Sequence, residues 1–479
     1  MLDILSWRSS HILFENADPF RFVYWRYAPS GTFRFVYWRF APSGRFAPSG
    51  RFDPIAMAYD WRKQVEHLAG PAPCPIVISY PCCGIVGSKS ATEYMDIETI
   101  AVNIFDLDDR YRTLLRKIFG PSAVLRLGTA AGDLLSHPMC DLEGCHVLVS
   151  GPPCPPWAGN GKKQSSKDER ALVYERVMQW LHFLSLFKGL LAFCIENVLG
   201  ITHAIGNKEP YIDVVIRAWR KHCPDWDIRY DILDTFEYGL PQQRKRVYLR
   251  GIRKVVAAAV PEVLPPFSVE VRPHLKDFLD LTEPNTTRFA LGSRRHNLKK
   301  WEWKVRLLLR QGKISAGDDT IAVVHLDRDP DIGGYNCQVA FDRVHTLTTA
   351  NAFLFLFSVD DIAMPDEDRK LMRYLTAKER FKLQGFDPAI SEDLPKNVHT
   401  KASGNAYAMP VVGAALCPLL GAIKEWPGLL DWSLKKVRPS ISLTEEVRPS
   451  TSLTEEVRPS PSEFIPLAIG RPRKRLRKV

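Results

Sequence analysis

The sequence predicts an α/β protein with a doubly wound, mostly parallel sheet, helices on both faces and a small second domain. Apolar runs typical of buried strands, 76–80, 147–149 and 191–195, each lead directly into a turn or a polar side chain. The chain has 479 residues, of which 45% are hydrophobic, so it can bury a sizeable core. Because ligands of such sheets bind beyond the carboxyl ends of the strands, the residues that follow these runs are the first candidates for a functional site.

Cys154 follows the second of these runs and is the most informative residue of the chain. It lies in the segment Gly-Pro-Pro-Cys-Pro-Pro-Trp at 151–157. Proline fixes φ near about −65° and removes an amide donor. We therefore expect the Cys154 thiol on a rigid, exposed loop, where it could act as a nucleophile. The alternative is a proline-rich turn with an incidental buried cysteine, because free cysteine often behaves as a small hydrophobe.

Glu196 ends the third apolar run and is followed by an asparagine. Beside a nucleophile on a neighbouring strand, its carboxyl group could donate a proton, with a pKa raised by apolar surroundings. The alternative is a helix cap or a surface acid.

A polar strand and a Gly-Asn turn complete the set of candidate segments. In 238–249, strand alternation puts Arg244, Arg246 and Tyr248 on one face. Two guanidinium groups on one face suit a phosphate or a planar polar ligand. The turn at 404–405 is expected to open an apolar helix and to approach a ligand through its backbone.

In their order along the chain, these segments resemble the cytosine-5 methyltransferase family, over roughly Ile76 to Leu420. Members of this family carry a Pro-Cys loop, a Glu-Asn-Val strand end, a Gln-x-Arg-x-Arg strand and a C-terminal Gly-Asn block. Asp168–Arg170 with the following helix, 172–187, is similar to the family's Asp-x-Arg helix, and 373–386 is similar to its Leu-Thr-x-x-Glu and Gln-Gly-Phe block. The resemblance implies a Rossmann-like catalytic domain that uses S-adenosyl-L-methionine.

The resemblance also implies a role for each catalytic position. Cys154 would add to carbon 6 of a cytosine that has been flipped out of its duplex. Glu196 would neutralise the charge that develops at ring nitrogen 3. Arg244 would hold the carbonyl oxygen of the base and help to lower the pKa of the Cys154 thiol, whereas Arg246 would serve phosphate binding or structure.

The positions that the resemblance assigns to cofactor binding lie at the ends of several predicted strands. They are Gly84, Ile85, Gly87, Asn103, Asp133, Leu134, Pro153, Asn405 and Ala406. Asn103 stands after the strand 99–102 where the family has an acid for the ribose hydroxyls, with Asp106 and Asp108 close behind. Asp133 would face the adenine amino group.

The chain departs from the family pattern at three further positions. Cys82 replaces an aromatic residue, Val86 replaces a glycine of the first cofactor loop, and Pro155 replaces the glutamine after the nucleophile. A branched side chain where backbone must pass close to the cofactor is an objection to binding. Weakened or lost cofactor binding is therefore kept as an alternative.

We expect five regions along the chain. They are an irregular N-terminal extension with repeats (1–70), a catalytic domain (71–253), a target-recognition domain (254–370), a segment that returns to the catalytic domain (371–432) and a disordered tail with repeats and a basic end (433–479). The Arg and aromatic repeats near the N-terminus could stack on single-stranded bases.

The target-recognition region is expected to be irregular. Its basic run at 294–301 suits a nucleic-acid backbone. Its Thr346–Thr348 segment resembles the Thr-Leu-Thr segment that supports base-flipping loops in the family.

Composition favours an anionic partner and excludes several other classes of protein. The net charge is +11, no apolar run has the length of a membrane span, and ten cysteines without paired spacing indicate reduced thiols and no metal site. The N-terminus lacks the features of a secretion signal. The basic C-terminus would direct the protein to the nucleus of a eukaryote; otherwise we expect it in the cytoplasm.

Three functions are carried forward from the sequence. The first is a cytosine-5 methyltransferase that acts on double-stranded DNA. The second acts on tRNA with the same machinery, although the chain lacks the Cys-Phe-Thr segment of that branch. The third is a nucleic-acid-binding scaffold that has lost cofactor binding.

Overall fold

The computed structural model describes residues 67–437 apart from some short internal segments, and two strands near the N-terminus. The internal gaps are 94, 96, 158–169, 205–208, 267–273, 287–289, 315–319, 333–336 and 350–352. The expectations for Asp168 and Glu169, and for the repeats and basic end after 437, lie outside the described residues.

A seven-stranded sheet forms the centre of the catalytic domain, as the sequence predicted. Its strand order is β5-β4-β3-β6-β7-β10-β8, and strands β3 to β7 are parallel whereas β10 runs antiparallel to both of its neighbours. The strands are β3 (Ile76–Pro81), β4 (Thr99–Asp106), β5 (Leu125–Leu127), β6 (Val147–Ser150), β7 (Ala192–Val198), β8 (Trp226–Asp234) and β10 (Lys245–Arg253).

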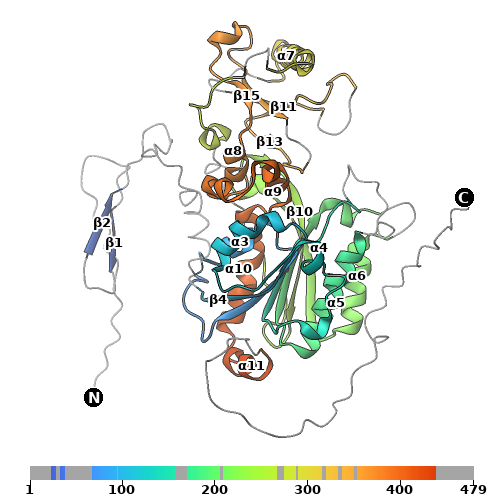
Figure 1. Ribbon diagram of the computed structural model, residues 1–479. Coiled ribbons are helices and arrows are strands. Elements are labelled where there is room, and N and C mark those ends of the chain that lie inside the picture. The colour runs from blue at the N-terminus through green and yellow to red at the C-terminus, as the bar shows by residue number, and fades with distance from the viewer. Residues whose placement is uncertain are drawn as a thin grey trace, which may run out of the picture. The chain divides into compact units, whose positions relative to one another are not determined.

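Helices cover both faces of this sheet (Figure 1). One face carries α5 (Ala171–Phe187) and α6 (Tyr211–His222), and the other carries α3 (Arg112–Phe119) and α10 (Met409–Glu425). The short helices α2 (Gly87–Glu93) and α4 (Gly128–Ala131) follow β3 and β5. The arrangement is the doubly wound one expected from the sequence.

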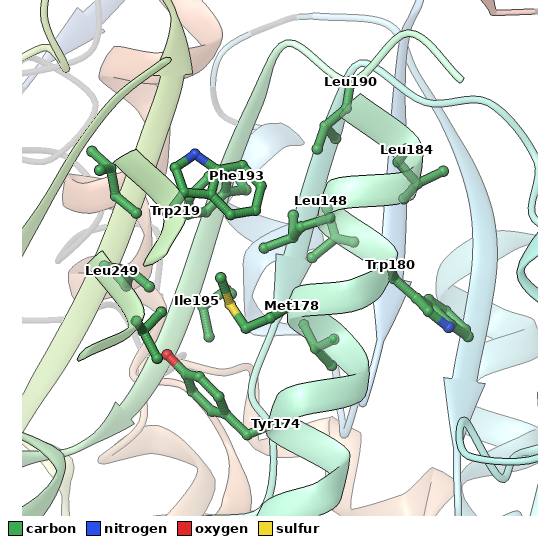
Figure 2. Packing of buried hydrophobic residues seen from close by; sticks show 14 of the residues in the cluster. Leu148, Tyr174, Met178, Trp180, Leu184, Leu190, Phe193, Ile195, Trp219 and Leu249 are labelled. Carbon is green, nitrogen blue, oxygen red and sulfur yellow. The ribbon is translucent and has the colours of Figure 1, made fainter. Parts of the chain in front are cut away.

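The core between α5 and the sheet is built from large apolar side chains (Figure 2). Met178 and Leu184 of α5 lie against Leu148 of β6 and Phe193 of β7. Each of these four residues is at most 3% exposed. Burying one such side chain contributes about 1.5–3 kcal/mol. This packing holds β6 and β7 rigidly, and it is the carboxyl ends of these two strands that carry Cys154 and Glu196.

The target-recognition region is a small α/β unit, so the prediction that it is irregular is wrong. A sheet of order β12-β11-β14-β15 packs against the 17-residue helix α7 (Arg294–Arg310). The strands are β11 (Ile321–His325), β12 (Ala340–Phe341), β14 (Leu354–Ser358) and β15 (Met372–Tyr374). The last strand lies just beyond the boundary expected at residue 370.

The basic run at 294–301 lies in α7, where two of its residues have structural contacts; its contact with a nucleic-acid backbone stays a prediction. Trp301 is fully buried and its Nε1 donates a hydrogen bond to the carbonyl of His325, while Lys300 pairs with Asp329 and Asp331. Apolar residues at helical spacing, Leu298, Trp301 and Val305, form the inner face of α7. Basic residues between them hid this pattern in the sequence.

The C-terminal segment returns to the catalytic domain through α8 (Ala377–Lys382), α9 (His399–Asn405), α10 and α11 (Leu429–Lys436). Gly404 and Asn405 end α9, and the buried helix α10 begins only at Met409, so the Gly-Asn pair does not itself open the apolar helix. Among the described residues, no single helix could cross a membrane; only the bent pair 396–405 and 409–425 has the length and composition.

In the N-terminal extension, which was expected to be irregular, two copies of the repeat form an antiparallel pair of strands. Strand β1 (Val23–Tyr27) pairs with β2 (Phe33–Tyr37), so that Trp25 lies opposite Phe35. The expectation that these residues stack on single-stranded bases remains a prediction.

Candidate active site

The candidate site lies where the strand order of the sheet reverses. β3 is flanked by β4 on one side and by β6 on the other, so the chain winds outward in both directions from this point. Ligands of open α/β sheets bind beyond the carboxyl ends of the strands at such a switch point. The loops after β3, β4, β6 and β7 therefore share one edge of the sheet.

The loop that carries Cys154 is fixed at both ends. At its start, the Ser150 hydroxyl donates to the carbonyl of Pro81 at 2.7 Å. At its end, the Trp157 amide donates to the carbonyl of Cys154 at 3.0 Å, and the indole is buried against Tyr174 and Tyr211. The Cys154 side chain remains partly exposed on this rigid loop, as the proline pattern predicted.

Arg246 and Glu196 form an ion pair beside this loop. The strands β10 and β7 pair antiparallel with Arg246 opposite Val198 and Tyr248 opposite Glu196. Arg246 Nε lies 2.9 Å from Glu196 Oε1, and the two side chains are only 14% and 13% exposed. A planar guanidinium and a carboxylate are thus held in a largely desolvated pocket next to a thiol.

Burial and the neighbouring charges shift the pKa of the Cys154 thiol in opposite directions. Burial raises the pKa of its thiol, Arg246 lowers it most among the nearby cations, Glu196 raises it, and Arg244 lowers it less than Arg246 does. The net direction is upward, because desolvation outweighs the two guanidinium groups. The thiol is therefore mainly protonated at neutral pH in the ligand-free protein.

Arg244 lies near Cys154 and lowers the pKa of its thiol, as expected, but most of its hydrogen bonds go to the protein backbone. It is 3% exposed, and it donates hydrogen bonds to the carbonyls of Leu347 (2.7 Å), Gly404 (3.1 Å) and Ala406 (2.9 Å). Burial lowers the pKa of its guanidinium to about 10, so the side chain remains a cation at neutral pH. Both arginines lie near Cys154, but Nη1 and Nη2 of Arg244 are committed to the protein backbone, whereas Arg246 pairs with Glu196.

Asn103 does not lie at the end of its strand, contrary to the prediction. β4 continues to Asp106, its register with β3 shifts between Ser79 and Pro81, and Asn103 has a φ of 47°, as in a bulge. The Asn103 side chain makes two hydrogen bonds to the backbone of Glu143. Its Nδ2 donates to the Glu143 carbonyl (2.9 Å), and its Oδ1 accepts from the Glu143 N–H (3.0 Å). Asn103 is therefore a structural residue, and the structure contradicts its assignment to the ribose.

Asp106 is the acid at the carboxyl end of β4 that the assignment missed. Its Oδ2 accepts from the Gly84 amide and its Oδ1 from the Asp108 amide, both at 2.8 Å. Burial raises the pKa of its carboxyl group, against the two amide hydrogen bonds. The apolar pair Ile104-Phe105 was the signal that the strand runs on past Asn103.

The loop after β3 has the backbone of a glycine-rich turn although it lacks one of the glycines. Cys82, Gly84 and Val86 have φ values of 55°, 53° and 55°. For a β-branched residue such as Val86 this left-handed conformation is a genuine outlier. Val86 thus holds a backbone conformation that glycine would adopt without strain.

The other predicted cofactor residues fall into two groups. Asp133 and Pro153 are partly exposed, and Asn405 is exposed at the end of α9. The second group comprises Ile85, Gly87, Leu134 and Ala406, which are buried. Leu134 is part of the main core, so its side chain is a packing residue rather than a ligand contact.

Two glycines allow close contacts between segments at this edge of the sheet. A Cβ on Gly132 would lie 2.0 Å from the carbonyl oxygen of Asp106, so only glycine allows the loop before Asp133 to approach β4. A Cβ on Gly151 would lie 2.7 Å from the Tyr407 hydroxyl. That hydroxyl is buried and has no hydrogen-bond partner among the described residues.

These residues fit S-adenosyl-L-methionine. Asp106 supplies an acid at the position where nucleotide-binding sheets hold ribose hydroxyls, and the turn from Cys82 to Gly87 keeps a glycine-like course. The buried Tyr407 hydroxyl is a polar group that a ligand would satisfy. Among the described residues, no group of His, Cys, Asp or Glu could hold a metal ion.

Comparison with known proteins identifies the family of this chain. The chain is 23% identical over 301 residues to the Type II methyltransferase M.NgoBI of Neisseria gonorrhoeae, covering 60% of this chain and 79% of that protein. It is 21% identical over 316 residues to M.HaeII of Haemophilus aegyptius, covering 65% and 83%. Among solved structures, it is similar to the Entamoeba histolytica methyltransferase EhMeth, with a TM-score of 0.47 and 16% identity over 72% of this chain and 98% of that one. Residues 82–417, well over half of the chain, match the family described as C-5 cytosine-specific DNA methylase, and the chain belongs to that family.

Proposed function

We propose that this protein transfers a methyl group from S-adenosyl-L-methionine to carbon 5 of a flipped-out cytosine in double-stranded DNA, through a covalent adduct with Cys154. The observation that carries the proposal is the Arg246–Glu196 ion pair beside a partly exposed cysteine, at the carboxyl ends of adjacent strands. Thiol, carboxylate and guanidinium are the three groups that activation of a cytosine ring requires.

Cys154 supplies the nucleophile. Its sulfur bonds to carbon 6 of the base, and the electron pair of the 5,6 double bond moves toward carbon 5 and ring nitrogen 3. The thiol loses a proton and nitrogen 3 gains one, so Glu196 can relay this proton between them. After methylation, a solvent water takes the proton from carbon 5, the 5,6 double bond re-forms as the thiolate leaves, and nitrogen 3 returns its proton to Glu196.

Arg246 positions the base and orders these steps. In the free protein its guanidinium holds Glu196 at 2.9 Å. An incoming cytosine presents a carbonyl oxygen that competes for the same donors, and the exchange frees the Glu196 carboxylate for nitrogen 3. Because the pocket is nearly buried, both contacts are stronger than they would be in water.

The cofactor would be held by the loops of the adjacent strands. Asp106 suits the ribose hydroxyls, and the turn from Cys82 to Gly87 suits the close approach of the methionyl part. When bound, S-adenosyl-L-methionine supplies an electrophilic methyl group. The chain's own residues then exclude water through Tyr407 and the proline-rich loop.

DNA is the proposed substrate because of the family and of its relatives. The matching family is described as a DNA methylase, and the relatives M.NgoBI and M.HaeII are Type II methyltransferases. The net charge of +11 suits a polyanion.

Trapping with 5-fluorocytosine tests the proposal. Fluorine at carbon 5 cannot leave as a proton does, so the methylated adduct should persist on mixed-sequence duplex DNA that contains this base and S-adenosyl-L-methionine. We expect a denaturation-resistant complex that maps to the Cys154 peptide. Trapping on tRNA alone would replace DNA by RNA as the substrate, and a folded protein that binds no cofactor would replace the enzyme by a binding scaffold.

A further inference from the structure

The Arg244 guanidinium lies at the junction of three segments that are far apart in the sequence. It precedes β10, and its hydrogen bonds reach Leu347, which follows β13 (Val344–His345), and Gly404 and Ala406, at the end of α9. Leu347 lies within the recognition region, in the segment between β13 and β14. Gly404 and Ala406 flank Asn405, in the segment assigned to the cofactor.

The backbones of these segments are in direct contact around Arg244. A Cβ on Gly404 would lie 2.4 Å from the carbonyl carbon of Thr348 and 2.5 Å from the Thr349 nitrogen. No residue larger than glycine fits at position 404. The end of α9 cannot move closer to the backbone of residues 348–349 unless that backbone also moves.

A neighbouring glutamine, Gln242, also connects Leu347 to the rest of the protein by hydrogen bonds. Gln242, in the two-residue strand β9 (Gln242–Gln243), accepts from the Leu347 amide at 3.2 Å and donates to the Leu383 carbonyl at 2.7 Å. β9 also pairs in parallel with β13, with Val344 opposite Gln242. The segment after β13 is thus held from one side by Gln242 and from the other by α9.

The hydrogen bonds of Arg244 are those of a buried cation to neutral carbonyls. Hydrogen bonds to charged groups are stronger than neutral ones, and removing the donor would leave three carbonyls without it. One rigid planar group therefore fixes the distance between the recognition segment and the cofactor segment. Arg244 lies only two residues before Arg246, which is paired with Glu196, so this junction is close to the candidate active site.

We propose that Arg244 is a positioning residue that makes cofactor binding and target-base binding interdependent. The inference rests on the proposed function. A ligand that orders the end of α9 also orders Leu347 and Thr348 through the guanidinium, and a base that orders the recognition segment acts in the opposite direction. Such coupling is reciprocal by thermodynamic necessity.

Equilibrium dialysis of S-adenosylhomocysteine, with and without saturating mixed-sequence duplex DNA, measures this coupling. We expect the duplex to tighten binding about tenfold in the unmodified protein and no more than about twofold in Arg244→Lys. Lysine keeps the charge but cannot span the carbonyls as a planar fork does. Arg250→Lys is the matched control, because Arg250 is fully buried on β10, directly after Arg244 in the chain, donates to the carbonyls of Pro261 and Ala415 and pairs with Asp231. It should keep the tenfold effect.

Equal coupling in Arg244→Lys and in the unmodified protein would overturn the inference, as would a protein that binds both ligands independently. Failure to bind either ligand would instead contradict the proposed function. If Arg244→Lys does not fold, Gln242→Leu weakens the same junction from its other side. A tenfold effect that survives in folded Gln242→Leu would then count against the inference.

Discussion

The loop after β6 and the loop after β3 lie at the same edge of the sheet but keep their shapes by different means. The Cys154 loop has prolines at positions that suit them and hydrogen bonds at both ends. The Cys82–Gly87 loop holds Cys82 and Val86 in a conformation that favours glycine. The proposed role of Cys154 depends on its thiol, so no other side chain could replace it. The Cys82–Gly87 turn depends only on its backbone conformation, which the surrounding protein can impose on a valine at the cost of local strain.

The largest expected effect separates the nucleophile from binding. Cys154→Ser should abolish methyl transfer and adduct formation, because an alcohol is far less ionised than a thiol at neutral pH, while DNA affinity stays within about twofold. Transfer to duplex DNA and a filter-binding titration measure the two quantities. Cys140→Ser, at an exposed cysteine, is the control and should change neither. Transfer by Cys154→Ser at the parent rate would show that another residue is the nucleophile.

The next effect concerns the ion pair that supports the nucleophile. Arg246→Met should lower the transfer rate about a hundredfold, as removal of a preorganised donor typically does. It also leaves Glu196 nearly buried without its cation. Arg229→Met breaks a more exposed ion-pair group with Asp231 and Glu262 and should leave the rate within about threefold. Equal losses in both variants would mean that Arg246 acts only through stability.

The pH dependence of thiol alkylation tests the electrostatics of the pocket. Since the pKa of Cys154 is raised, its thiolate fraction is small at neutral pH and grows as pH rises. The rate of iodoacetamide modification, followed at the Cys154 peptide by mass spectrometry, should still be increasing at pH 9. Arg246→Met should shift the profile to higher pH, because the cation that lowers this pKa most is gone. A profile that levels off below pH 7 would contradict the predicted direction.

The loop after β3 is tested by comparing alanine with glycine at position 86. At a left-handed φ, glycine avoids a strain of about 1–2 kcal/mol that alanine retains. Val86→Gly should therefore be more stable than Val86→Ala by about 1 kcal/mol in urea unfolding. Ser88, in α2, gives the opposite control, because glycine in a helix is less stable than alanine by about 1 kcal/mol. The same order at both positions would show that Val86 is not strained.

The smallest expected effect comes from the hydroxyl between the two loops. The buried Tyr407 hydroxyl has no hydrogen-bond partner in the part of the chain that the structure describes, so Tyr407→Phe should raise the stability of the ligand-free protein by roughly 0.5–1 kcal/mol. Tyr238 donates to the carbonyl of Leu264 at 3.0 Å, so Tyr238→Phe should lower stability by about 1 kcal/mol. Thermal unfolding without cofactor measures both. A loss of stability in Tyr407→Phe would indicate that its hydroxyl has a partner.

Local patterns in the sequence were sufficient for the central sheet and for the position of Cys154 on a loop at its edge. Apolar runs followed by Cys154 and Glu196 predicted the strands β6 and β7, and alternation predicted that Arg244 and Arg246 share a face. The same reasoning failed for α7, where basic residues masked an inner face of Leu298, Trp301 and Val305. The helical spacing of apolar residues can be recognised in a sequence only where basic residues between them do not obscure it.

The sequence by itself determined the class of fold, the family and the residue types of the site, because these depend on short-range patterns and on chemistry. Only the tertiary structure decided which of two similar residues takes a given place. Arg246 rather than Arg244 pairs with Glu196 beside Cys154, because carbonyls from residues 347, 404 and 406 accept the hydrogen bonds of Arg244 Nη1 and Nη2. Asp106 rather than Asn103 ends β4, because a bulge lengthens that strand. Both choices depend on contacts between distant segments, which spacing along the chain does not encode.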